Sequence, residues 1–198
     1  MSELGIWEPL RVEEVAELLQ DLTAPWWIAG GWALDAFIGR QTREHGDVDV
    51  GVLRRDQAAV QEHLAAWDLQ AADPPGRLRP WYKGEVLPET VHDIWCRTSK
   101  EASWGLQLML DDAEGDEWLY RRMPSVRRSL DSLVWRRDGV PYLIPEVQLL
   151  YKSAQRSPKA ESDFNACLPH LEGSQRSWLG NALAIAHPGH PWREVLLA

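Results

Sequence analysis

The chain has 198 residues, a formal net charge of -9 and a sequence pI near 5.1. With 44% hydrophobic and 26% charged residues, its composition is that of an ordinary globular protein of one domain, or of one domain with a helical appendage. The acidic balance argues against broad, sequence-independent binding to nucleic acid, which needs a basic face. It allows a small phosphorylated ligand held by a few arginines, for which the sequence offers Arg40, Arg43, Arg121, Arg122, Arg136 and Arg137.

Targeting and membrane signals are not evident in the sequence. The opening MSELGIWEPL is acidic and polar rather than basic and then apolar. No apolar run approaches the roughly 20 residues that a membrane span needs. Cys96 and Cys167 have no metal-type spacing, so we expect two reduced, buried thiols. These features favour a cytoplasmic protein with no membrane partner, and they indicate no oligomeric state.

Periodicity predicts the first elements in chain order. Apolar residues at helical spacing predict an amphipathic helix over residues 11–22. A short apolar strand follows at 26–29, and residues 32–38 have helical character until Gly39 ends the helix. Residues 46–53, GDVDVGVL, alternate with period two, which predicts a strand.

The middle of the chain is predicted to be rich in strands. Asp56 is a candidate N-cap for a helix that reaches about Trp67, and the Pro/Gly-rich stretch 73–80 reads as a connector. Strand-like runs follow at residues 90–97, 104–110, 117–122 and 132–136, and the turn RRDG leads from the last of them to residues 140–142. The polar stretch DDAEGDE predicts a hairpin between the second and third runs.

From Pro145 onward the pattern is helical. Pro145 suits a first helical position, Ser157-Pro158 restarts a helix, and residues 174–186 predict a third one. We therefore expect an α/β portion over residues 1–144 and a helical portion over 145–198.

Two aspartates are the first candidates for chemistry. Asp47 and Asp49 lie two apart on a predicted strand, so their carboxylates project from one face. Side by side they repel unless a cation lies between them, and magnesium favours such oxygen ligands. Val48, Val50 and Val52 make the other face apolar, which predicts a half-buried strand. Taken alone, the pair is equally typical of a solvated strand face.

The break at Gly30-Gly31 gives the pair its context. Glycine lets a backbone approach a phosphate closely, and the start of the following helix offers N–H groups and the positive end of the helix dipole. Two glycines alone are as compatible with a plain turn. Their combination is far less frequent by chance: a strand, two glycines, a helix and then a strand with Asp-x-Asp. We expect the glycines and the aspartates to meet across a cleft.

The stretch AGGWALDAFIGRQTREHGDVDV, residues 29–50, resembles the signature of the nucleotidyltransferase superfamily, and most closely its aminoglycoside and lincosamide adenylyltransferase-like branch. That branch shows Gly-Gly-Trp, then Gly-Arg-x-Thr-Arg-x-His, then Asp-x-Asp. The segment IPEVQLLYKSAQRSPKAESDF, residues 144–164, is similar to its C-terminal helical signature. The resemblance implies a polymerase-β-like α/β fold, in which helices flank a mixed sheet.

The resemblance also implies transfer of AMP from ATP to a hydroxyl of a small molecule, such as an aminoglycoside-like compound. Pyrophosphate is the leaving group. Gly30 and Gly31 would hold the β- and γ-phosphates, and Asp47 and Asp49 would bind magnesium (Mg2+), which neutralises charge at the reacting phosphate. Such chemistry depends chiefly on positioning and electrostatics. Further candidates for the nucleotide are Arg43, which could equally pair with an acid across the turn, and Lys152, which could equally lie on a solvated helix face. In the pair Arg121-Arg122, strand alternation predicts that only one side chain faces the site.

A third carboxylate is expected on a later strand, where this sequence departs from the pattern. Alignment of WGLQLML places Gln107 at the acid position, and glutamine neither accepts a proton at neutral pH nor binds magnesium well. Asp93, on the adjacent predicted strand, can replace it as the catalytic carboxylate, although it reads equally as a polar residue at a strand end. Asp111, at the end of the Gln107 strand, is the other candidate.

Three functions follow from these features. The first is the AMP transfer described above, in which an acidic surface would concentrate a polycationic acceptor. The second, motivated by Gln107, is a catalytically impaired nucleotide-binding or regulatory protein on the same fold. The third is transfer of AMP to a protein.

Overall fold

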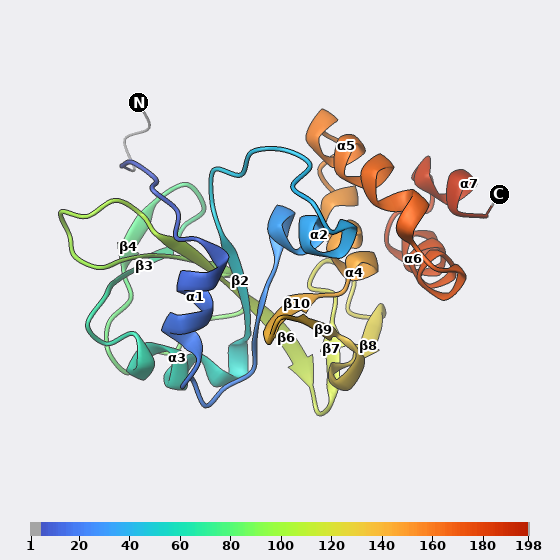
Figure 1. The fold of residues 1–198 in the computed structure, drawn as a ribbon. Helices are drawn as coiled ribbons and strands as arrows, with labels where there is room; N and C mark the ends of the chain where they lie inside the picture. Colours follow the sequence, from blue (N-terminus) through green and yellow to red (C-terminus); the bar gives the residue numbers. More distant parts are fainter. Residues whose placement is uncertain (1–4, 198) are drawn as a thin grey trace. The chain divides into compact units, whose positions relative to one another are not determined.

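A computed structural model describes residues 5–197 and is drawn in Figure 1. The chain folds into two compact units and passes between them three times. Unit 1 consists of the described residues of Met1–Ile28 and of His45–Ala113, and unit 2 consists of Ala29–Glu44 and the described residues of Glu114–Ala198. The functional boundary at residue 144 stays a prediction, and every helix after that residue belongs to unit 2.

Unit 1 is built on a mixed sheet with the strand order β4-β3-β5-β6-β2-β1. Strands β2 and β6 are parallel, and the other neighbouring pairs are antiparallel. The strands are β1 (Trp26–Ile28), β2 (Asp49–Leu53), β3 (Asp68–Ala72), β4 (Leu78–Pro80), β5 (Asp93–Arg97) and β6 (Leu106–Glu114). The parallel pair brings the Asp49 end of β2 beside the first residues of β6.

The two faces of this sheet differ in their cover. Helices α1 (Val12–Leu19) and α3 (Gln57–His63) lie on one side, as Figure 1 shows, and the ring of His63 hydrogen-bonds the Leu18 carbonyl oxygen at 2.7 Å. On the other side the Trp7 ring meets the Trp95 ring edge-on at 5.0 Å, and the segment around Trp7 pairs in parallel with Trp104 just before β6. That second face is only half-buried, so its side chains remain accessible.

Strand β2 differs from its prediction in two ways. It begins at Asp49 rather than Gly46, and Gly51 and Leu53 are buried as well as Val50 and Val52. The prediction of a half-buried strand is therefore wrong beyond Asp49. The reason is the neighbouring strand β1, where Trp27 pairs with Gly51 and lies against it so closely that a Cβ on Gly51 would be 2.0 Å from the indole Nε1.

Several helices and strands begin or end at residues other than those predicted from the sequence. Helix α3 ends at His63 rather than near Trp67, and Asp56 stands at its N-cap without a side-chain capping hydrogen bond. Strand β4 lies inside the predicted connector, and β3, β8 (Arg127–Ser129) and α7 (Trp192–Leu197) were not predicted. These elements are short or weakly patterned, so neighbouring strands and helices define them more than their own periodicity does.

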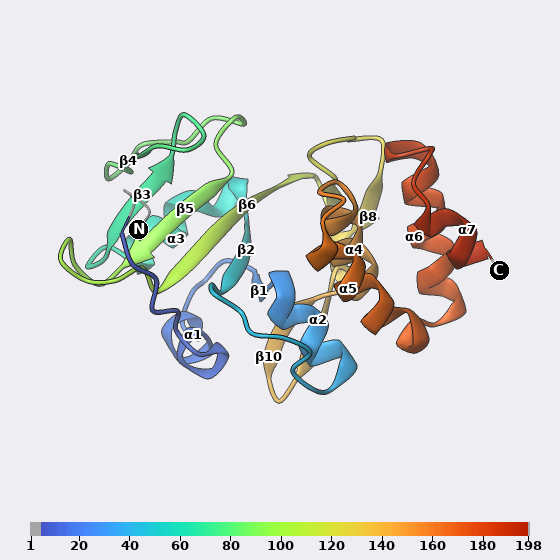
Figure 2. The ribbon, with the colours of Figure 1, turned by 90° about the horizontal axis from the view of Figure 1, so that it is seen from above.

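Unit 2 is mainly helical. Its elements are α2 (Gly30–Ile38), β7 (Glu117–Leu119), β8, the hairpin of β9 (Val134–Arg137) and β10 (Val140–Leu143), α4 (Pro145–Ser153), α5 (Pro158–Cys167), α6 (Gly173–Ala186) and α7. Helix α4 is almost wholly buried, because α2, α5 and α6 pack against it (Figure 2). Short 3-10 turns are η1 (Arg54–Asp56), η2 (Leu130–Ser132) and η3 (Leu168–His170).

The predicted helix signals of unit 2 are confirmed. Pro145 is in the first turn of α4, and the Ser157 side chain caps α5 by accepting a hydrogen bond from the Ala160 backbone N–H. Gly39 ends α2 in the left-handed conformation, with φ 87°. Within the described residues, no helix has both the length and the apolar composition to cross a bilayer.

Both cysteines are free and buried, as predicted. Burial raises the pKa of Cys167 to about 12, and burial also raises the pKa of Cys96 far above its ordinary value. Neither thiol is therefore available as a thiolate at neutral pH.

Candidate functional site

The half-buried face of the unit 1 sheet carries a row of four side chains across the strands. Asp49 on β2 pairs with Gln107 on β6, Gln107 pairs with Trp95 on β5, and Trp95 pairs with Gln70 on β3. Paired residues in a sheet share a face, and neighbouring strands lie about 4.8 Å apart. The row therefore puts an acid, an amide, an aromatic ring and a second amide side by side.

Gln107 is in direct contact with the acid that could replace it. Its side-chain Nε2 donates a hydrogen bond to the Asp93 Oδ1 at 3.0 Å. Asp93 lies opposite Met109, one diagonal step from Gln107, so both side chains project from the same face. The amide therefore lies beside two carboxylates, Asp49 on one neighbouring strand and Asp93 on the other.

Asp111 is placed differently. It lies four residues farther along β6 than Gln107, which corresponds to about 13 Å of strand, and it pairs with Leu53 at the far end of β2. Its side chain is buried, with 6% of its surface exposed. Of the two acids considered for the third carboxylate, Asp93 is the one that contacts Gln107.

A single arginine holds the segment that leads to Asp93. The Arg54 guanidinium donates to the backbone oxygens of Pro88 and Val91 at 2.9 and 2.7 Å, and it pairs with Asp112 on β6 at 2.5 Å. Arg54 also contacts the ring of His92. Because Arg54 directly follows β2, it ties the strand that begins with Asp49 to the segment that ends at Asp93.

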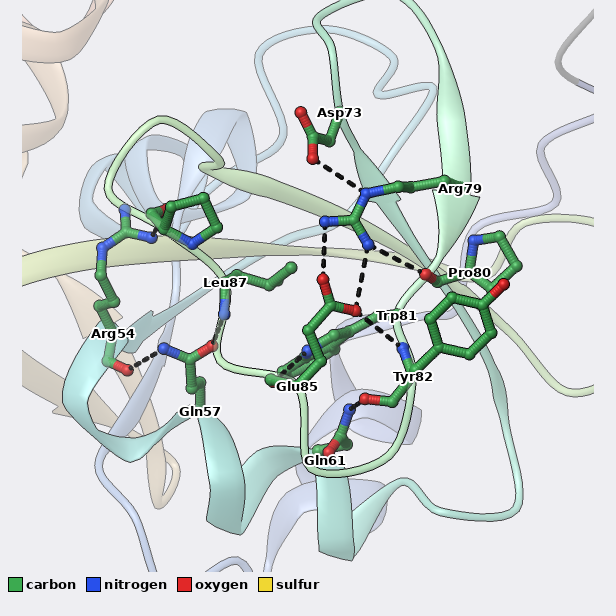
Figure 3. Close-up of polar contacts among 11 residues, drawn as sticks. Arg54, Gln57, Gln61, Asp73, Arg79, Pro80, Trp81, Tyr82, Glu85 and Leu87 are labelled. Carbon is green, nitrogen blue, oxygen red and sulfur yellow. Dashed lines mark hydrogen bonds and ion pairs between the residues drawn. The ribbon is translucent and has the colours of Figure 1, made fainter.

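The loop before that segment is anchored on α3, as Figure 3 shows. The Gln57 side chain accepts a hydrogen bond from the Leu87 N–H at 2.6 Å, and the Gln61 side chain donates to the Tyr82 carbonyl oxygen at 2.8 Å. Arg79 bridges Asp73 and Glu85 across the same loop (Figure 3). The loop is therefore held at several points rather than loosely attached.

Asp47 lies just before β2, and the strand-like geometry extends back to it. The Gln107 backbone N–H donates to the Val48 carbonyl oxygen at 3.0 Å. Val48 is fully buried, whereas Asp47 and Asp49 on either side of it are half-buried. This alternation is that of an extended chain whose two carboxylates share a face.

The donor set of these aspartates suits magnesium better than a metal held by protein ligands alone. Across residues 5–197, no group of three or more His, Cys, Asp or Glu side chains is arranged to hold a metal ion. Magnesium is commonly bound by one or two carboxylates together with substrate phosphates. Asp47 and Asp49 supply two such carboxylates, so the residues present fit an ion that arrives with a nucleotide.

A cavity of about 420 Å³ opens on the same face of unit 1. It is lined by Gln70 and Arg97 of the sheet and by Lys100 and Trp104. Arg97 stacks 4.2 Å from the centre of the Trp104 ring and pairs with Asp68 at 2.7 Å. The volume lies within the range of roughly 300–1,000 Å³ that is typical of small-molecule sites.

In unit 2, the glycine pair opens helix α2. Gly30 has φ 67°, a left-handed conformation that favours glycine. Its backbone N–H donates to the Gln148 Oε1 of α4 at 2.7 Å. Gly31 follows in the first helical turn, where backbone N–H groups have no partner within the helix.

The two predicted nucleotide-binding cations of unit 2 meet at one buried acid. Asp163 of α5 binds the Arg43 guanidinium through both oxygens, at 2.9 and 3.2 Å, and the Lys152 Nζ lies 2.7 Å from its Oδ2. Only 3% of the Asp163 side chain is exposed. Burial by itself would raise the pKa of Asp163, but the hydrogen bonds from Arg43 and Lys152 together lower it. Asp163 is therefore the shared partner of two cations.

The loop that carries Arg43 is fixed by a second buried acid. Asp35 of α2, 5% exposed, accepts hydrogen bonds from the Thr42 backbone N–H at 3.1 Å and from the Thr42 hydroxyl at 2.5 Å. None of Asp35, Gln148 and Asp163 was among the site residues predicted from the sequence. The segment ESDF lay within the quoted signature, yet nothing local in the sequence separates a buried acid from a solvated one.

The remaining arginine candidates are dispersed, with one exception. Arg40 is exposed, Arg136 donates to the Gly139 carbonyl oxygen, and Arg137 donates to the Ala36 carbonyl oxygen. Arg121 and Arg122, however, both lie over the ring of Tyr151, at 5.5 and 5.9 Å from its centre. The predicted strand alternation of this pair is wrong, because β7 ends at Leu119 and both residues lie in the turn that follows, whereas the statement that only one of them faces the site stays a prediction.

Two solved structures share the fold of this chain. A lincosamide antibiotic adenylyltransferase, LnuA, with bound lincomycin superposes with a TM-score of 0.54 at 16% identity, over 83% of this chain and 100% of that one. ANT(2'')-Ia in complex with adenylyl-2''-tobramycin superposes with a TM-score of 0.55 at 14% identity, over 87% of this chain and 95% of that one. The predicted nucleotidyltransferase fold, a mixed sheet with flanking helices, is confirmed.

Part of the sequence is similar to aminoglycoside nucleotidyltransferases. Residues 11–74 match the family model described as aminoglycoside-2''-adenylyltransferase. A 2''-aminoglycoside nucleotidyltransferase of Escherichia coli is 34% identical over 65 residues, which are 31% of this chain and 37% of that protein. Another, of Klebsiella pneumoniae, is 41% identical over 56 residues, which are 27% of this chain and 32% of that protein. The chain thus spans about a third of the curated relatives that it matches, and the resemblance to the aminoglycoside and lincosamide branch is confirmed.

Proposed function

We propose that this protein is a cytoplasmic, magnesium-dependent nucleotidyltransferase that moves AMP from ATP to a hydroxyl of a small molecule. The observation that carries the proposal is the contact of Gln107 with Asp93, beside Asp49 on the neighbouring strand. It supplies a third carboxylate close to the Asp47–Asp49 pair, although the aligned acid position holds glutamine. The proposal assigns the transfer chemistry to residues 1–144 and treats 145–198 as the helical portion.

Magnesium, when bound by Asp47 and Asp49, would neutralise charge on the reacting phosphate. Asp93 would accept the proton of the attacking acceptor hydroxyl, so that the oxygen can bond to the α-phosphorus as pyrophosphate leaves. The Gln107 hydrogen bond to Oδ1 supports this role, because it orients the carboxylate. Arg54 supports it further by holding the segment before Asp93.

The nucleotide phosphates are assigned to unit 2. The Gly31 N–H and the start of α2 suit an anion, and the Gly30 N–H can serve only if a phosphate oxygen replaces the Gln148 oxygen that now accepts its hydrogen bond. Arg43 and Lys152, which both bind Asp163, supply the cationic groups for the same phosphates. That the glycines face the aspartates across a cleft stays a prediction, since the two sets lie in different units.

The acceptor is assigned to the cavity of unit 1. Gln70 on its wall and Gln107 beside Asp93 both pair with Trp95, so they are two strands apart, or about 10 Å. A hydroxylated molecule of the size of one or two sugar rings spans such a distance. The molecules bound in the two structural neighbours, lincomycin and adenylyl-2''-tobramycin, favour an antibiotic-like acceptor of this kind.

The test uses the full chain with α-labelled ATP, magnesium and a panel of aminoglycosides and lincosamides. The expected result is label on an acceptor, dependent on magnesium and reduced at least a hundredfold in Asp49→Asn. Asp116→Asn, an exposed aspartate at a turn, is the matched control and keeps its rate. Transfer that is equal in wild type and Asp49→Asn would contradict the assignment.

A second candidate is a nucleotide-binding protein without turnover, and the glutamine at position 107 favours it. ATP would then bind in calorimetry while pyrophosphate release stays at background with every acceptor. Label that appears on a co-purified protein instead of a small molecule would identify protein AMP transfer.

A further inference from the structure

Arg121 and Arg122 converge on one aromatic ring although they are adjacent in the chain. Both guanidinium groups lie within 6 Å of the Tyr151 ring centre, at 5.5 and 5.9 Å. Tyr151 is itself packed edge-on by Trp118 and Tyr120, with ring centres 5.9 and 5.2 Å away. This buried aromatic cluster gives the two arginines a rigid floor and limits their freedom.

A third arginine reaches the same place from another element. Arg156, in the turn between α4 and α5, lies close enough to His187 at the end of α6 to affect it. The pKa of His187 is lowered first by burial and then by the charges of Arg122 and Arg156. The His187 ring also meets the Tyr120 hydroxyl at 3.5 Å. Arg121 and Arg122 from one turn therefore act on Tyr120, and Arg122 acts on His187 together with Arg156 from another turn.

No carboxylate in the described part of the chain pairs with any of these three arginines. In contrast, the arginines that do form ion pairs include Arg43, Arg54, Arg79, Arg97, Arg127 and Arg128. The chain carries 30 Asp and Glu residues against 21 Lys and Arg residues, so an arginine in it is more readily paired with an acid than left beside other cations. Like charges held together raise the energy of the folded state unless an anion offsets them.

Helix α4 relates this cluster to the phosphate-binding candidates. Gln148, Tyr151 and Lys152 are three and four residues apart, so they lie on one side of the helix. Gln148 binds the Gly30 N–H, Lys152 binds Asp163, and Tyr151 lies beneath Arg121 and Arg122. The three groups therefore share one helix face within a single unit.

We propose that Arg121, Arg122 and Arg156 form a binding site for a multiply charged phosphate group, with the polyphosphate end of the nucleotide as its ligand. Arginine presents planar, fixed donors that match phosphate oxygens, and two or three of them distinguish pyrophosphate from a monoanion. The identity of the ligand rests on the proposed function. The existence of the anion site does not.

The experiment measures binding of inorganic pyrophosphate by calorimetry at low, constant ionic strength, since salt screens exposed charges. The variants are Arg122→Ala and Arg156→Ala, whose side chains are exposed, with Arg121→Lys to preserve packing on Tyr151. Arg136→Ala, an exposed arginine of β9 in the same unit, is the matched control. Melting temperatures of all variants report whether the fold is kept.

Each charge-assisted contact removed is expected to weaken pyrophosphate binding by about tenfold or more. Arg136→Ala should bind as wild type does. Pyrophosphate affinity that is unchanged in Arg122→Ala and Arg156→Ala, or the same loss in Arg136→Ala, would overturn the proposal.

Two further arms identify the source of the phosphate. ATP should lose affinity in the same variants, whereas glucose 6-phosphate should bind weakly and independently of them. If pyrophosphate and glucose 6-phosphate lose affinity in the variants but ATP does not, the anion site stands and the nucleotide assignment is overturned in favour of a phosphorylated acceptor. Wild-type chain that lacks transferase activity but binds pyrophosphate through these arginines would refute the proposed function alone.

Discussion

Gln107 donates a 3.0 Å hydrogen bond to Asp93 from a strand position where the related signature has an acid. A carboxylate at 107 would lie between Asp49 and Asp93 and would add a third negative charge to the same sheet face. The amide avoids that repulsion and supplies a donor instead. The departure from the signature is therefore compatible with an active site in which Asp93 is the carboxylate that accepts the proton.

Asp93→Asn should abolish most transfer while keeping the fold. The substitution removes the proton acceptor but preserves shape, and loss of a general base typically lowers rates by about a hundredfold to ten-thousandfold. Steady-state transfer of AMP to the best acceptor is the measurement, with ATP affinity determined in parallel. An unchanged rate would remove Asp93 from the mechanism.

Gln107→Leu tests the orienting role without adding charge. Loss of one hydrogen bond to a charged carboxylate corresponds to about 1.5–3 kcal/mol, so kcat should fall roughly tenfold to a hundredfold. The kcat of Gln107→Asp should fall at least as far, because this substitution removes the hydrogen-bond donor and places a third carboxylate beside two others. A rise in kcat in Gln107→Asp would instead support the impaired-protein hypothesis, in which the glutamine is what blocks turnover.

Gly51→Ala should destabilise unit 1. The new Cβ would lie 2.0 Å from Nε1 and 2.4 Å from Cε2 of Trp27, whose ring is 1% exposed and cannot move aside. Overpacking of this kind costs about 1–3 kcal/mol. Urea unfolding of the wild type, Gly51→Ala, Trp27→Leu and the double variant measures the coupling, and the second substitution should restore part of the loss. Additive effects would mean that the two side chains do not clash.

Asp163→Asn should lower stability by about 3 kcal/mol, because it removes the buried carboxylate that Arg43 and Lys152 both bind. For a chain of this length the melting temperature should fall by about 6–12 °C. Lys152→Met, which leaves the two-point Arg43 contact in place, is the control and should cost less. Equal losses in both variants would contradict the central role given to Asp163.

The stabilisation that Asp163 provides should depend on pH in a defined direction. The folded-state pKa of Asp163 is lowered, so its stabilisation is present above the unfolded pKa, about 3.9, and is lost as pH falls through the folded value. The difference in stability between wild type and Asp163→Asn should therefore shrink in acid. A difference that grows as pH falls would contradict this account.

His190 should make the fold sensitive to mild acid. It is 3% exposed, its Nδ1 accepts from the Trp192 N–H at 3.3 Å, and its Nε2 then donates to the Ser153 carbonyl oxygen at 3.1 Å. Burial is the main cause that lowers its pKa. A second proton would fill the accepting nitrogen, so the unfolded chain binds it more readily and stability falls as pH drops below about 6.5.

Melting temperatures between about pH 8 and pH 5 test this expectation. Wild type should lose stability toward the acid end, and His190→Gln should be less stable at the alkaline end but flatter across the range. His170→Gln, at an exposed position, should follow the wild-type slope. A wild-type slope retained in His190→Gln would assign the sensitivity to another group.

Local sequence patterns were sufficient for the elements whose cause is local. Pro145, Ser157 and Gly39 act through their own backbone preferences, and all three stand at the helix ends predicted from them. The spacing of Asp47 and Asp49 places both on one face because an extended chain alternates. The glycine pair before α2 is a backbone signal of the same kind.

Tertiary structure decided the relationships between strands and helices far apart in the chain. Strand register put Gln107 against Asp93, and it brought Trp27 over Gly51 and so buried a strand face predicted to be open. Helix packing turned Asp163 into the buried partner of Arg43 and Lys152, and a turn after β7 brought Arg121 and Arg122 to one ring. Periodicity reports only which face a residue occupies, whereas the neighbour on that face depends on how the whole chain closes.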